Sequence, residues 1–443
     1  MQREIITMTL IDLTVPVARN RHLGTLPVAI IGAGPIGLAA AAELHERGID
    51  FIVYEAGNSV ASSMAAWGHT RLFSPWKHLV DPAARRLLLA SGWIEPNESS
   101  LPTGSDLIAQ YLAPLAALDA IASRIRTGTT VVAVSREGMD RTRTAGRDSR
   151  AFTLRLAGAA GDLSDVQAAA VIDASGTYLN PNSLGSNGLD PLGLPDVEDH
   201  VGHALPDVLG ADRLRFAGKH TVVVGAGHSA ANTLINLAKL AQEERGTTIT
   251  WIIRGETLRV LGSADDELAA RASIGTAVGR LVASGAVSQV DGFEIVGLER
   301  VGDGVDIVGT RGGTMEHVRA DLIVNATGYR PKLDMLREIR LSLDEIVEAP
   351  AALATLIDPN LHSCGTVTPH GVTELTQPER DFYIVGMKSY GRAPTFLLAT
   401  GYEQVRSIAD ELAGNREAAR QVRLVLPATG VCSTDIGGGS NCC

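Results

Sequence analysis

The sequence predicts an α/β protein that contains two Rossmann-like dinucleotide-binding units. Two similar stretches carry this prediction. PVAIIGAGPIGLAAAAEL begins at Pro27, and HTVVVGAGHSAAN begins at His220. In each, an apolar run leads directly into a glycine-rich turn and then into a helix-forming segment. A strand, a glycine turn and a helix in this order open a βαβ unit that binds a dinucleotide.

The first glycine turn has the pattern GxGxxG, formed by Gly32, Gly34 and Gly37, with Pro35 inside it. The first glycine permits a tight turn, the second lets a pyrophosphate approach the backbone, and the third lets the helix pack on the strand. The free N–H groups of the helix start then face the phosphates. Glu55 follows the next apolar strand, FIVYE, where a carboxylate binds ribose hydroxyls.

The second glycine turn has the pattern GxGxxA, and the residues singled out in it are Gly225, Gly227, His228, Ser229 and Ala230. The strand after it, ITWIIR, ends in Arg254 instead of an acid. An arginine there suits the 2′-phosphate of NADPH, whereas an acid suits the ribose of NADH, so NADPH is favoured. A surface arginine paired with Glu256 is the alternative. His228 either contacts the nicotinamide half or is a turn residue only.

The remaining segments divide the chain into five parts. Residues 129–136, 151–156 and 168–173 are predicted as a β-meander, and one more helix is predicted from about Pro394 to Gly414. We expect an N-terminal extension (1–25), a first domain in two pieces (26–200 and 329–426), an inserted second domain (201–328) and a C-terminal tail (427–443).

Composition excludes several classes of protein. The formal net charge is −11, from 39 basic and 50 acidic residues, which argues against a nucleic-acid binder. No apolar run approaches the ~18 residues of a membrane span, and no signal peptide is evident. Three of the four cysteines fall in the last twelve residues, so we expect a reducing, cytoplasmic setting. The expected partners are a small-molecule substrate and, in a homodimer, a second copy of the chain.

Three further motifs resemble those of flavoproteins with two dinucleotide-binding domains, which include thioredoxin reductases and flavin-containing monooxygenases. VIDASGTYLNP (171–181) and VNATGYRP (324–331) resemble the crossings between the domains, and DFYIVGMKSYGRAPTFLLATGYEQ (381–404) resembles the return into the first domain. The resemblance implies an FAD-binding Rossmann-like domain with a β-meander and an inserted NAD(P)H-binding Rossmann-like domain. It adds these cofactor-binding candidates: Trp76, Val132, Ser175, Gly176, Thr327, Gly328, Gly386 and Thr395.

Within this group the sequence resembles the monooxygenases more than the reductases. The redox cysteine pairs CxxC and CxxxxC of the reductases do not occur, whereas LPTGSDLIAQYLAPLA (101–116) resembles a monooxygenase helix. The fingerprint FxGxxxH is incomplete, because only His203 fits it, and Val197 and Asp199 replace the other two residues. His203 and Arg71 are candidate catalytic residues near the flavin. A loop histidine, a structural arginine and a structural Trp76 are the alternatives.

The tail carries a second group of candidates, Cys432, Cys442 and Cys443. The adjacent pair of thiols could act catalytically or, with Cys432, bind a thiophilic ion such as As(III) or Hg(II). The chain also resembles the flavoproteins of arsenic-resistance clusters, for which an As(III)-binding tail would make sense. Three hypotheses therefore stand: an FAD- and NADPH-dependent monooxygenase-like enzyme, an NADPH-dependent disulfide or metalloid reductase that uses the tail, and a non-catalytic nucleotide sensor.

Overall fold

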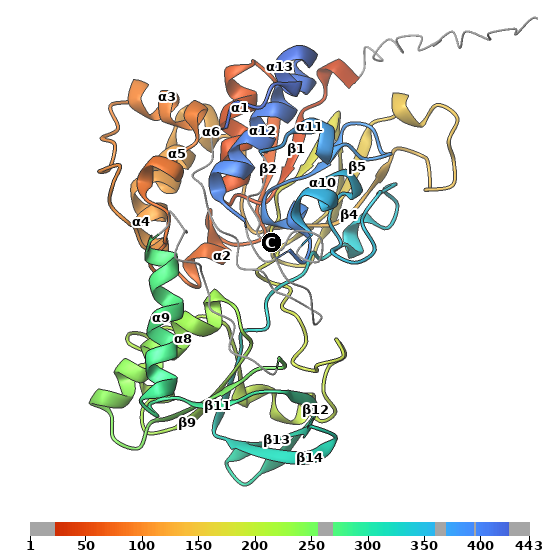
Figure 1. The fold of residues 1–443 in the computed structure, drawn as a ribbon. Coiled ribbons are helices and arrows are strands. Elements are labelled where there is room, and N and C mark those ends of the chain that lie inside the picture. Colours follow the sequence, from red (N-terminus) through yellow and green to blue (C-terminus); the bar gives the residue numbers. More distant parts are fainter. Residues whose placement is uncertain (1–22, 256–268, 359–368, 394–395, 425–443) are drawn as a thin grey trace, which may run out of the picture.

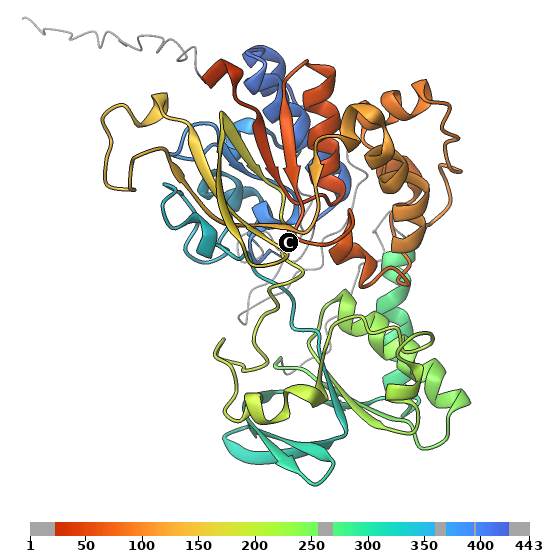
Figure 2. The same ribbon diagram turned by 180° about the vertical axis from the view of Figure 1, so that it is seen from behind.

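Two α/β bodies joined by two crossings of the chain make up the fold (Figure 1). The computed structural model describes residues 23–255, 269–358, 369–393 and 396–424. The upper body in Figure 1 contains both ends of the described chain, and the lower body, in green and teal, contains its middle. The view from behind shows the same division (Figure 2). The predicted α/β fold with one unit inserted into the other is confirmed.

The first body is built on a parallel sheet with the strand order β16-β7-β1-β2-β3. Its strands are β1 (Val28–Ile31), β2 (Phe51–Tyr54), β3 (Ile125–Arg126), β7 (Ala170–Asp173) and β16 (Phe382–Ile384). Strands β1 and β7 are buried along their whole length, as expected for parallel strands covered on both faces. Helices α1 (Pro35–Glu46) and α12 (Leu398–Leu412) pack together on one face.

An antiparallel meander covers the other face of the first sheet. It consists of β4 (Thr129–Arg136), β5 (Phe152–Gly158) and β6 (Leu163–Ala168). The prediction that residues 168–173 form its third strand is wrong. Residues 170–173 form β7, which pairs in parallel with β1 and β16, and Ala168 is the last residue of β6. The true third strand, β6, is a largely exposed edge strand, so it lacks the apolar run by which a buried strand is recognised.

The shorter helices of the first body lie around this sheet. Between β2 and β3 the chain forms α2 (Ser62–Ala65), α3 (Pro82–Ala90), α4 (Gly104–Leu107), α5 (Ala113–Ala117) and α6 (Asp119–Ala122). The return segment adds α10 (Ala351–Ile357), α11 (Val372–Leu375) and α13 (Arg416–Arg420). Helix α12 begins at Leu398, not at Pro394 as predicted, because Leu397 is still extended. No helix in the described ranges has the length and apolar character needed to cross a membrane.

The second body repeats the plan of the first. Its parallel sheet has the order β11-β10-β9-β15-β8, formed by β8 (Val201–His203), β9 (His220–Val224), β10 (Thr248–Ile252), β11 (Ser288–Val290) and β15 (Leu322–Asn325). A second meander follows β11 and contains β12 (Phe293–Val301), β13 (Gly304–Arg311) and β14 (Thr314–Ala320). The helices are α7 (Arg213–Phe216), α8 (His228–Glu243) and α9 (Ala269–Ala283).

The correspondence between the two sheets is close. The equivalent strands are β1 and β9, β2 and β10, β3 and β11, and β7 and β15. In each body the meander comes, in chain order, between the third and the fourth of these strands. The fifth strand differs in origin: β16 comes after the rest of its sheet in the chain, whereas β8 comes before. This difference follows from the insertion of the second unit into the first.

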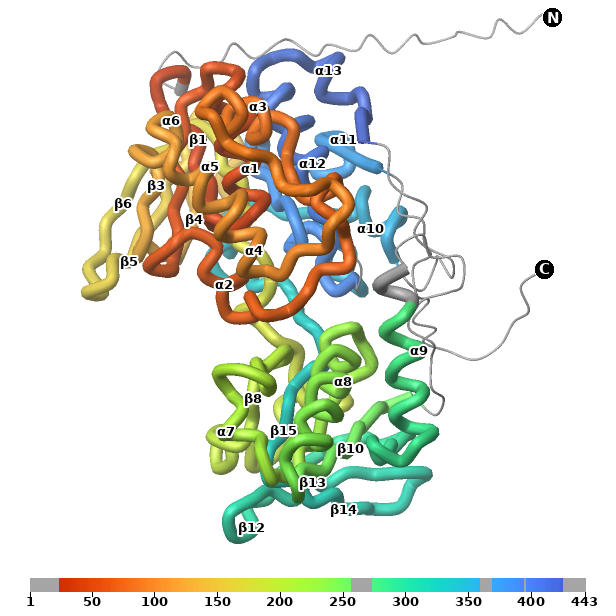
Figure 3. Tube along the Cα trace, turned by 90° about the vertical axis from the view of Figure 1, so that its left-hand side faces the viewer, coloured from red at the N-terminus to blue at the C-terminus, as the bar shows by residue number. Residues whose placement is uncertain are grey.

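The two crossings run side by side between the bodies (Figure 3). The backbone N–H of Asn182 donates to the carbonyl of Gly328 at 2.9 Å, and that of Arg330 donates to the carbonyl of Asn180 at 3.1 Å. Leu184, which lies before β8, already packs in the core around the second sheet. The domain limits drawn from the sequence stay a prediction.

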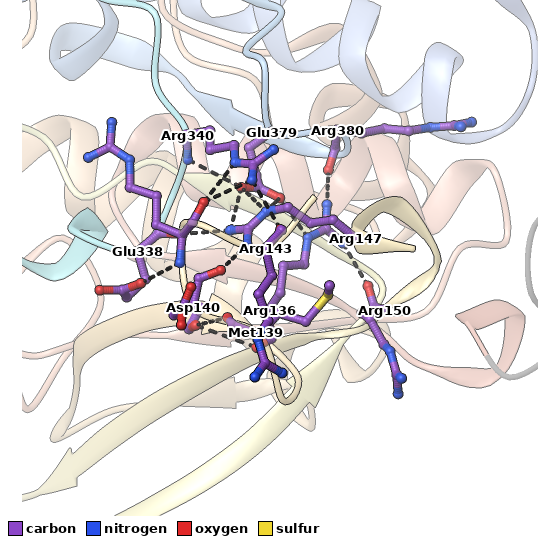
Figure 4. Close-up of polar contacts among 12 residues, drawn as sticks. Arg136, Met139, Asp140, Arg143, Arg147, Arg150, Glu338, Arg340, Glu379 and Arg380 are labelled. Atoms are coloured by element: carbon purple, nitrogen blue, oxygen red, sulfur yellow. Dashed lines mark hydrogen bonds and ion pairs between the residues drawn. The ribbon is translucent and has the colours of Figure 1, made fainter. Parts of the chain in front are cut away.

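A buried ionic cluster joins the first meander to the return segment (Figure 4). The Glu379 carboxylate accepts hydrogen bonds from the guanidinium groups of Arg136 and Arg147 at 2.8 Å each, and all three side chains are at most 3% exposed. Arg136 also lies over the ring of Phe152, 3.7 Å from its centroid. Arg147 belongs to the arginine-rich loop before β5, so part of that loop is a fixed support of the fold.

Candidate dinucleotide sites

The first glycine turn has the geometry that the pattern GxGxxG predicts. Gly32 has φ +98°, and a Cβ there would lie 2.8 Å from the carbonyl oxygen of Ala174. A Cβ on Gly37 would lie 1.9 Å from the carbonyl oxygen of Gly32. A Cβ on Gly34, in contrast, would meet no atom within 4 Å. The outer glycines are therefore required by the turn itself, whereas the middle one leaves open space over the start of α1.

Glu55 holds the first turn in shape. It lies directly after β2, and one of its carboxylate oxygens accepts a hydrogen bond from the backbone N–H of Ala33 at 2.7 Å. The other oxygen accepts from the N–H of Gly57 and the hydroxyl of Ser62, both at 2.8 Å. A carboxylate has about four acceptor positions, so Glu55 retains capacity for one more donor such as a ribose hydroxyl.

The second glycine turn has the same design. Gly225 has φ +126°, and a Cβ there would lie 2.2 Å from the carbonyl oxygen of Ala326. A Cβ on Gly227 would meet nothing within 4 Å. The indole N–H of Trp251 donates to the carbonyl of Gly225 at 2.6 Å and fixes the turn from β10. Ala230, at the third position, is fully buried at the helix–strand contact.

The predicted neighbours of the second turn are found beside it. His228 and Ser229 are the first two residues of α8, and the His228 ring contacts Phe73 of the first body with 5.5 Å between ring centroids. Arg254 lies two residues beyond β10, is exposed, and donates to the carbonyl of Ser186 at 2.9 Å. Its guanidinium keeps further N–H groups for a phosphate. Glu256, the alternative partner of Arg254, lies outside the described residues.

Each crossing begins with a turn that packs behind a glycine turn. Ser175 and Gly176 follow β7, and Thr327 and Gly328 follow β15. Both glycines have positive φ, +70° and +98°. The contacts of Gly32 with Ala174 and of Gly225 with Ala326 show that the structure brings these predicted residues together with their glycine turns.

The return segment also meets the first glycine turn. A Cβ on Gly386, which has φ +67°, would lie 3.0 Å from a side-chain carbon of Ile36 in that turn. A Cβ on Gly401, in the first turn of α12, would lie even closer, 2.4 Å from a side-chain carbon of Ile36. The backbone N–H of Gly386 donates to Gln404 of α12 at 2.8 Å. Gly386 and the start of α12 thus lie against the first glycine turn, while Thr395 lies outside the described residues.

Asp173 and Lys388 are buried site residues that sequence reasoning missed. The ammonium group of Lys388 donates to the carboxylate of Asp173 at 2.7 Å, and both side chains are at most 1% exposed. An acid at the end of the apolar run AVID was a signal for Asp173. No pattern in the sequence distinguishes Lys388, because its partner lies 215 residues away.

His203 lies at the carboxyl end of β8, beside the two crossings. Its ring stacks on that of Tyr178 with 5.3 Å between centroids, and the ring of Tyr329 lies 6.2 Å from it. Partial burial lowers the pKa of His203 below its usual value, so the ring is neutral at pH 7. The position is at the edge of the second sheet, which suits either contact with a nicotinamide or a role in the crossing.

The other predicted site residues have contacts elsewhere. Arg71 is exposed and donates to the carbonyl of Leu101 at 2.7 Å. Trp76 is 4% exposed and packs in the main hydrophobic core of the first body. Val132 is the exposed extra residue at an irregularity of the β4–β5 pairing. Cys432, Cys442 and Cys443 all lie outside the described residues.

A cavity of about 950 Å³ lies away from both glycine turns. Thr376, Gln377, Arg380 and Glu411 help to line it, at the amino-terminal end of β16 and the C-terminal end of α12. Dinucleotides bind at the carboxyl ends of parallel strands, so this cavity is not part of the candidate sites. The described residues contain no cluster of three or more His, Cys, Asp or Glu side chains that could hold a metal ion.

The fold and the two glycine turns define a protein with two dinucleotide-binding domains, one inserted into the other. A protein-family model described as pyridine nucleotide-disulphide oxidoreductase matches residues 29–353. The chain therefore belongs to this family. A comparison with curated protein sequences gave no match.

Solved structures with a similar fold include both reductases and oxygenases. The bacillithiol disulfide reductase of Bacillus cereus has a TM-score of 0.66 at 20% identity, over 88% of this chain and 99% of its own. The FAD-bound cadaverine monooxygenase of desferrioxamine biosynthesis from Erwinia amylovora has a TM-score of 0.62 at 14% identity, over 92% and 98%. The thioredoxin reductase of T. acidophilum has a TM-score of 0.54 at 16% identity, over 88% and 98%. These likenesses show the fold.

Proposed function

We propose that the protein is an FAD-dependent NADPH oxidoreductase, with FAD at the first glycine turn and NADPH at the second. The observation that supports this most is the pair of turns in which the middle glycine alone, Gly34 or Gly227, faces open space. A pyrophosphate needs that space beside the N-terminus of a helix. The residues present therefore fit two dinucleotides.

The assignment of the two cofactors rests on the residue after the second strand of each unit. Glu55 keeps one acceptor position for a ribose hydroxyl of FAD, and it orders the turn through Ala33 at the same time. Arg254 offers a positive charge at the equivalent place and selects the 2′-phosphate of NADPH. Bound FAD supplies the redox chemistry, by accepting a hydride from NADPH and passing the electrons to an acceptor.

For the acceptor we favour molecular oxygen and a small substrate, as in a monooxygenase. The chain has four cysteines, at 364, 432, 442 and 443, and none forms a CxxC or CxxxxC pair. Among the described residues that border the first turn, Ile36, Gly386 and Gly401 are apolar.

NADPH oxidation by the purified, yellow protein tests this proposal. It should be oxygen-dependent with a suitable small substrate, and a disulfide such as oxidised glutathione should not replace oxygen. Oxidation that proceeds without oxygen on addition of a disulfide or As(III) would favour a reductase. A colourless protein that FAD does not reconstitute would contradict both functions.

One observation favours the reductase as a second candidate. After α13 the chain runs back along α12, and the backbone N–H of Arg423 donates to Glu403, near the start of that helix, at 3.0 Å. The start of α12 borders the first glycine turn. Cys432 comes eight residues after Leu424, a separation that spans at most about 29 Å. We infer that thiols on a tail that starts there could pass electrons to a disulfide or a metalloid at the first site.

A further inference from the structure

The duplicated fold places the same local turn at the end of β7 and of β15. In Asp173–Ala–Ser–Gly the serine hydroxyl donates to the aspartate Oδ1 at 2.6 Å, and its backbone N–H donates to the same atom at 3.1 Å. In Asn325–Ala–Thr–Gly the threonine hydroxyl and N–H donate to the asparagine Oδ1 at 2.7 and 3.2 Å. The two turns are equivalent down to these hydrogen bonds.

The two turns differ at the second terminal side-chain atom, which is Oδ2 in Asp173 and Nδ2 in Asn325. The Nδ2 of Asn325 donates to the backbone carbonyl of Asn182 at 2.9 Å, so the second turn is neutral. The Oδ2 of Asp173 instead accepts from the ammonium group of Lys388 at 2.7 Å. Lys388 also donates to the hydroxyl of Ser175 at 3.1 Å. The first turn therefore contains a buried ion pair where the second has a neutral hydrogen bond.

A buried ion pair is a costly way to hold a turn. Removing two charges from water carries a desolvation penalty, and neutral replacements of buried pairs are often as stable. The turn at Asn325 shows that a neutral version is available in this fold. Stability of the turn alone thus gives no reason for the charges of Asp173 and Lys388.

The ion pair lies directly behind the first glycine turn. The backbone N–H of Ala174 donates to the carbonyl of Ile31 at 2.9 Å, and a Cβ on Gly32 would lie 3.0 Å from the Cα of Ser175. Lys388 comes from the 3₁₀ turn Gly386–Tyr390, which follows β16. Lys388 therefore ties the return segment to the crossing turn at the point where both border the first dinucleotide site.

We propose that Lys388 is a positioning residue of the first dinucleotide site, which holds Asp173 and Ser175 so that the glycine turn stays in its phosphate-binding form. The inference rests on the proposed function, because it takes FAD as the ligand. Lys388 does so through Asp173 and Ser175, since the described contacts of its ammonium group are both with them.

Titration of the full-length, flavin-free protein with FAD tests this role. Lys388→Met leaves the Asp173 carboxylate buried without its cation, and FAD affinity should fall by at least about tenfold. The double variant Asp173→Asn, Lys388→Gln replaces the ion pair by a neutral amide hydrogen bond. It should bind FAD within about threefold of wild type, because it restores the link. The control is Lys239→Met, which removes an exposed lysine of α8 and should change nothing.

Three outcomes separate the alternatives. Wild-type protein that does not bind FAD would contradict the proposed function and not this role in particular. Lys388→Met that binds FAD as wild type does, or a double variant that folds normally yet binds as weakly as the single one, would overturn the positioning role. If Lys388→Met does not fold, Ser175→Ala decides, because it keeps the ion pair and removes only the bridging hydroxyl. Its FAD affinity should fall with little change in unfolding temperature, and unchanged affinity would overturn the role.

Discussion

At the scale of single residues, the glycines of each turn separate into those that the fold requires and those that a ligand requires. Gly37 has no room for a side chain, whereas Gly34 has free space on the side where a Cβ would project. Gly34 also has φ −77° and ψ −173°, a conformation that any residue adopts. The apoprotein therefore offers no reason of its own for a glycine at this position.

This contrast predicts that Gly34→Val folds normally but does not retain FAD. Gly227→Val should stay yellow, because the first site is intact, and should no longer be reduced by NADPH. Flavin absorbance after purification and anaerobic reduction by NADPH measure the two effects. Gly37→Ala is the comparison, since its Cβ would lie 1.9 Å from a backbone oxygen and should lower the unfolding temperature. Loss of flavin from Gly227→Val but not from Gly34→Val would show that the cofactor assignment is reversed.

Arg254 is the residue expected to select NADPH. A charge-assisted hydrogen bond to the 2′-phosphate contributes about 1.5–3 kcal/mol, or roughly one to two decades in affinity. Arg254→Ala should raise the KM for NADPH by that factor and leave the KM for NADH nearly unchanged. Arg245→Ala, beyond the far end of α8, is a matched control. An equal change for both coenzymes would contradict the assignment.

At the scale of elements, the strands and helices with a clear pattern were predicted well and those defined by distant partners were not. The run AVID was read as a meander strand, because a short apolar run does not show which sheet it joins. Pairing with β1 and β16 places this strand in the parallel sheet, and β16 lies about 200 residues later in the chain. Helix α12 begins later than predicted, because the backbone of Leu397 is extended, and neither the proline nor the apolar pattern shows this.

The cluster around Glu379 predicts a strong effect of one substitution on stability. Glu379→Gln leaves Arg136 and Arg147 buried without a counter-charge, which should lower the free energy of unfolding by about 3–5 kcal/mol. Glu338→Gln is the control, because that side chain accepts only the exposed N–H of Arg141. Chemical denaturation at pH 7 measures the difference, and equal stabilities would show that the cluster is not a support of the fold.

The same cluster gives a pH dependence with a definite sign. Burial alone would raise the pKa of Glu379, but hydrogen bonds from Arg147 and Arg136 outweigh it and the pKa is lowered. A carboxyl whose folded pKa lies below its unfolded value of about 4.3 stabilises the protein above that pH. The difference in stability between wild type and Glu379→Gln should therefore be constant near neutral pH and shrink as the pH falls below about 4.3.

At the scale of the whole molecule, both dinucleotide units and their crossings were visible in the sequence, because each rests on a local motif. The links between them were not. Lys388 with Asp173, and Glu379 with Arg136, pair residues more than 200 positions apart. Asp173 and Lys388 each lie in a motif that resembles the family, but neither motif shows that the two side chains meet.

The tail is the feature on which the choice between the two proposed functions depends. Removal of the residues after Leu426 should leave the FAD content and the unfolding temperature unchanged, because the anchoring contacts of Arg423 and Arg406 with Glu403 remain. If the tail is a thiol arm, Cys442→Ser with Cys443→Ser should sharply reduce As(III) binding and the turnover of a disulfide. NADPH oxidation with oxygen should not change. A double variant equal to wild type in every assay would leave the oxygenase as the function.

The late position of β16 has a consequence for the order in which the chain folds during synthesis. The second domain is continuous, and its last strand ends at Asn325, whereas the first sheet lacks its edge strand until Ile384 has been made. Domains fold as units while the chain emerges, at roughly 5–20 residues per second. The nascent first domain thus holds β7 with one edge unpaired for several seconds while the inserted domain is already complete. Premature release in that window would free a chain with a finished second domain and an open, aggregation-prone first sheet.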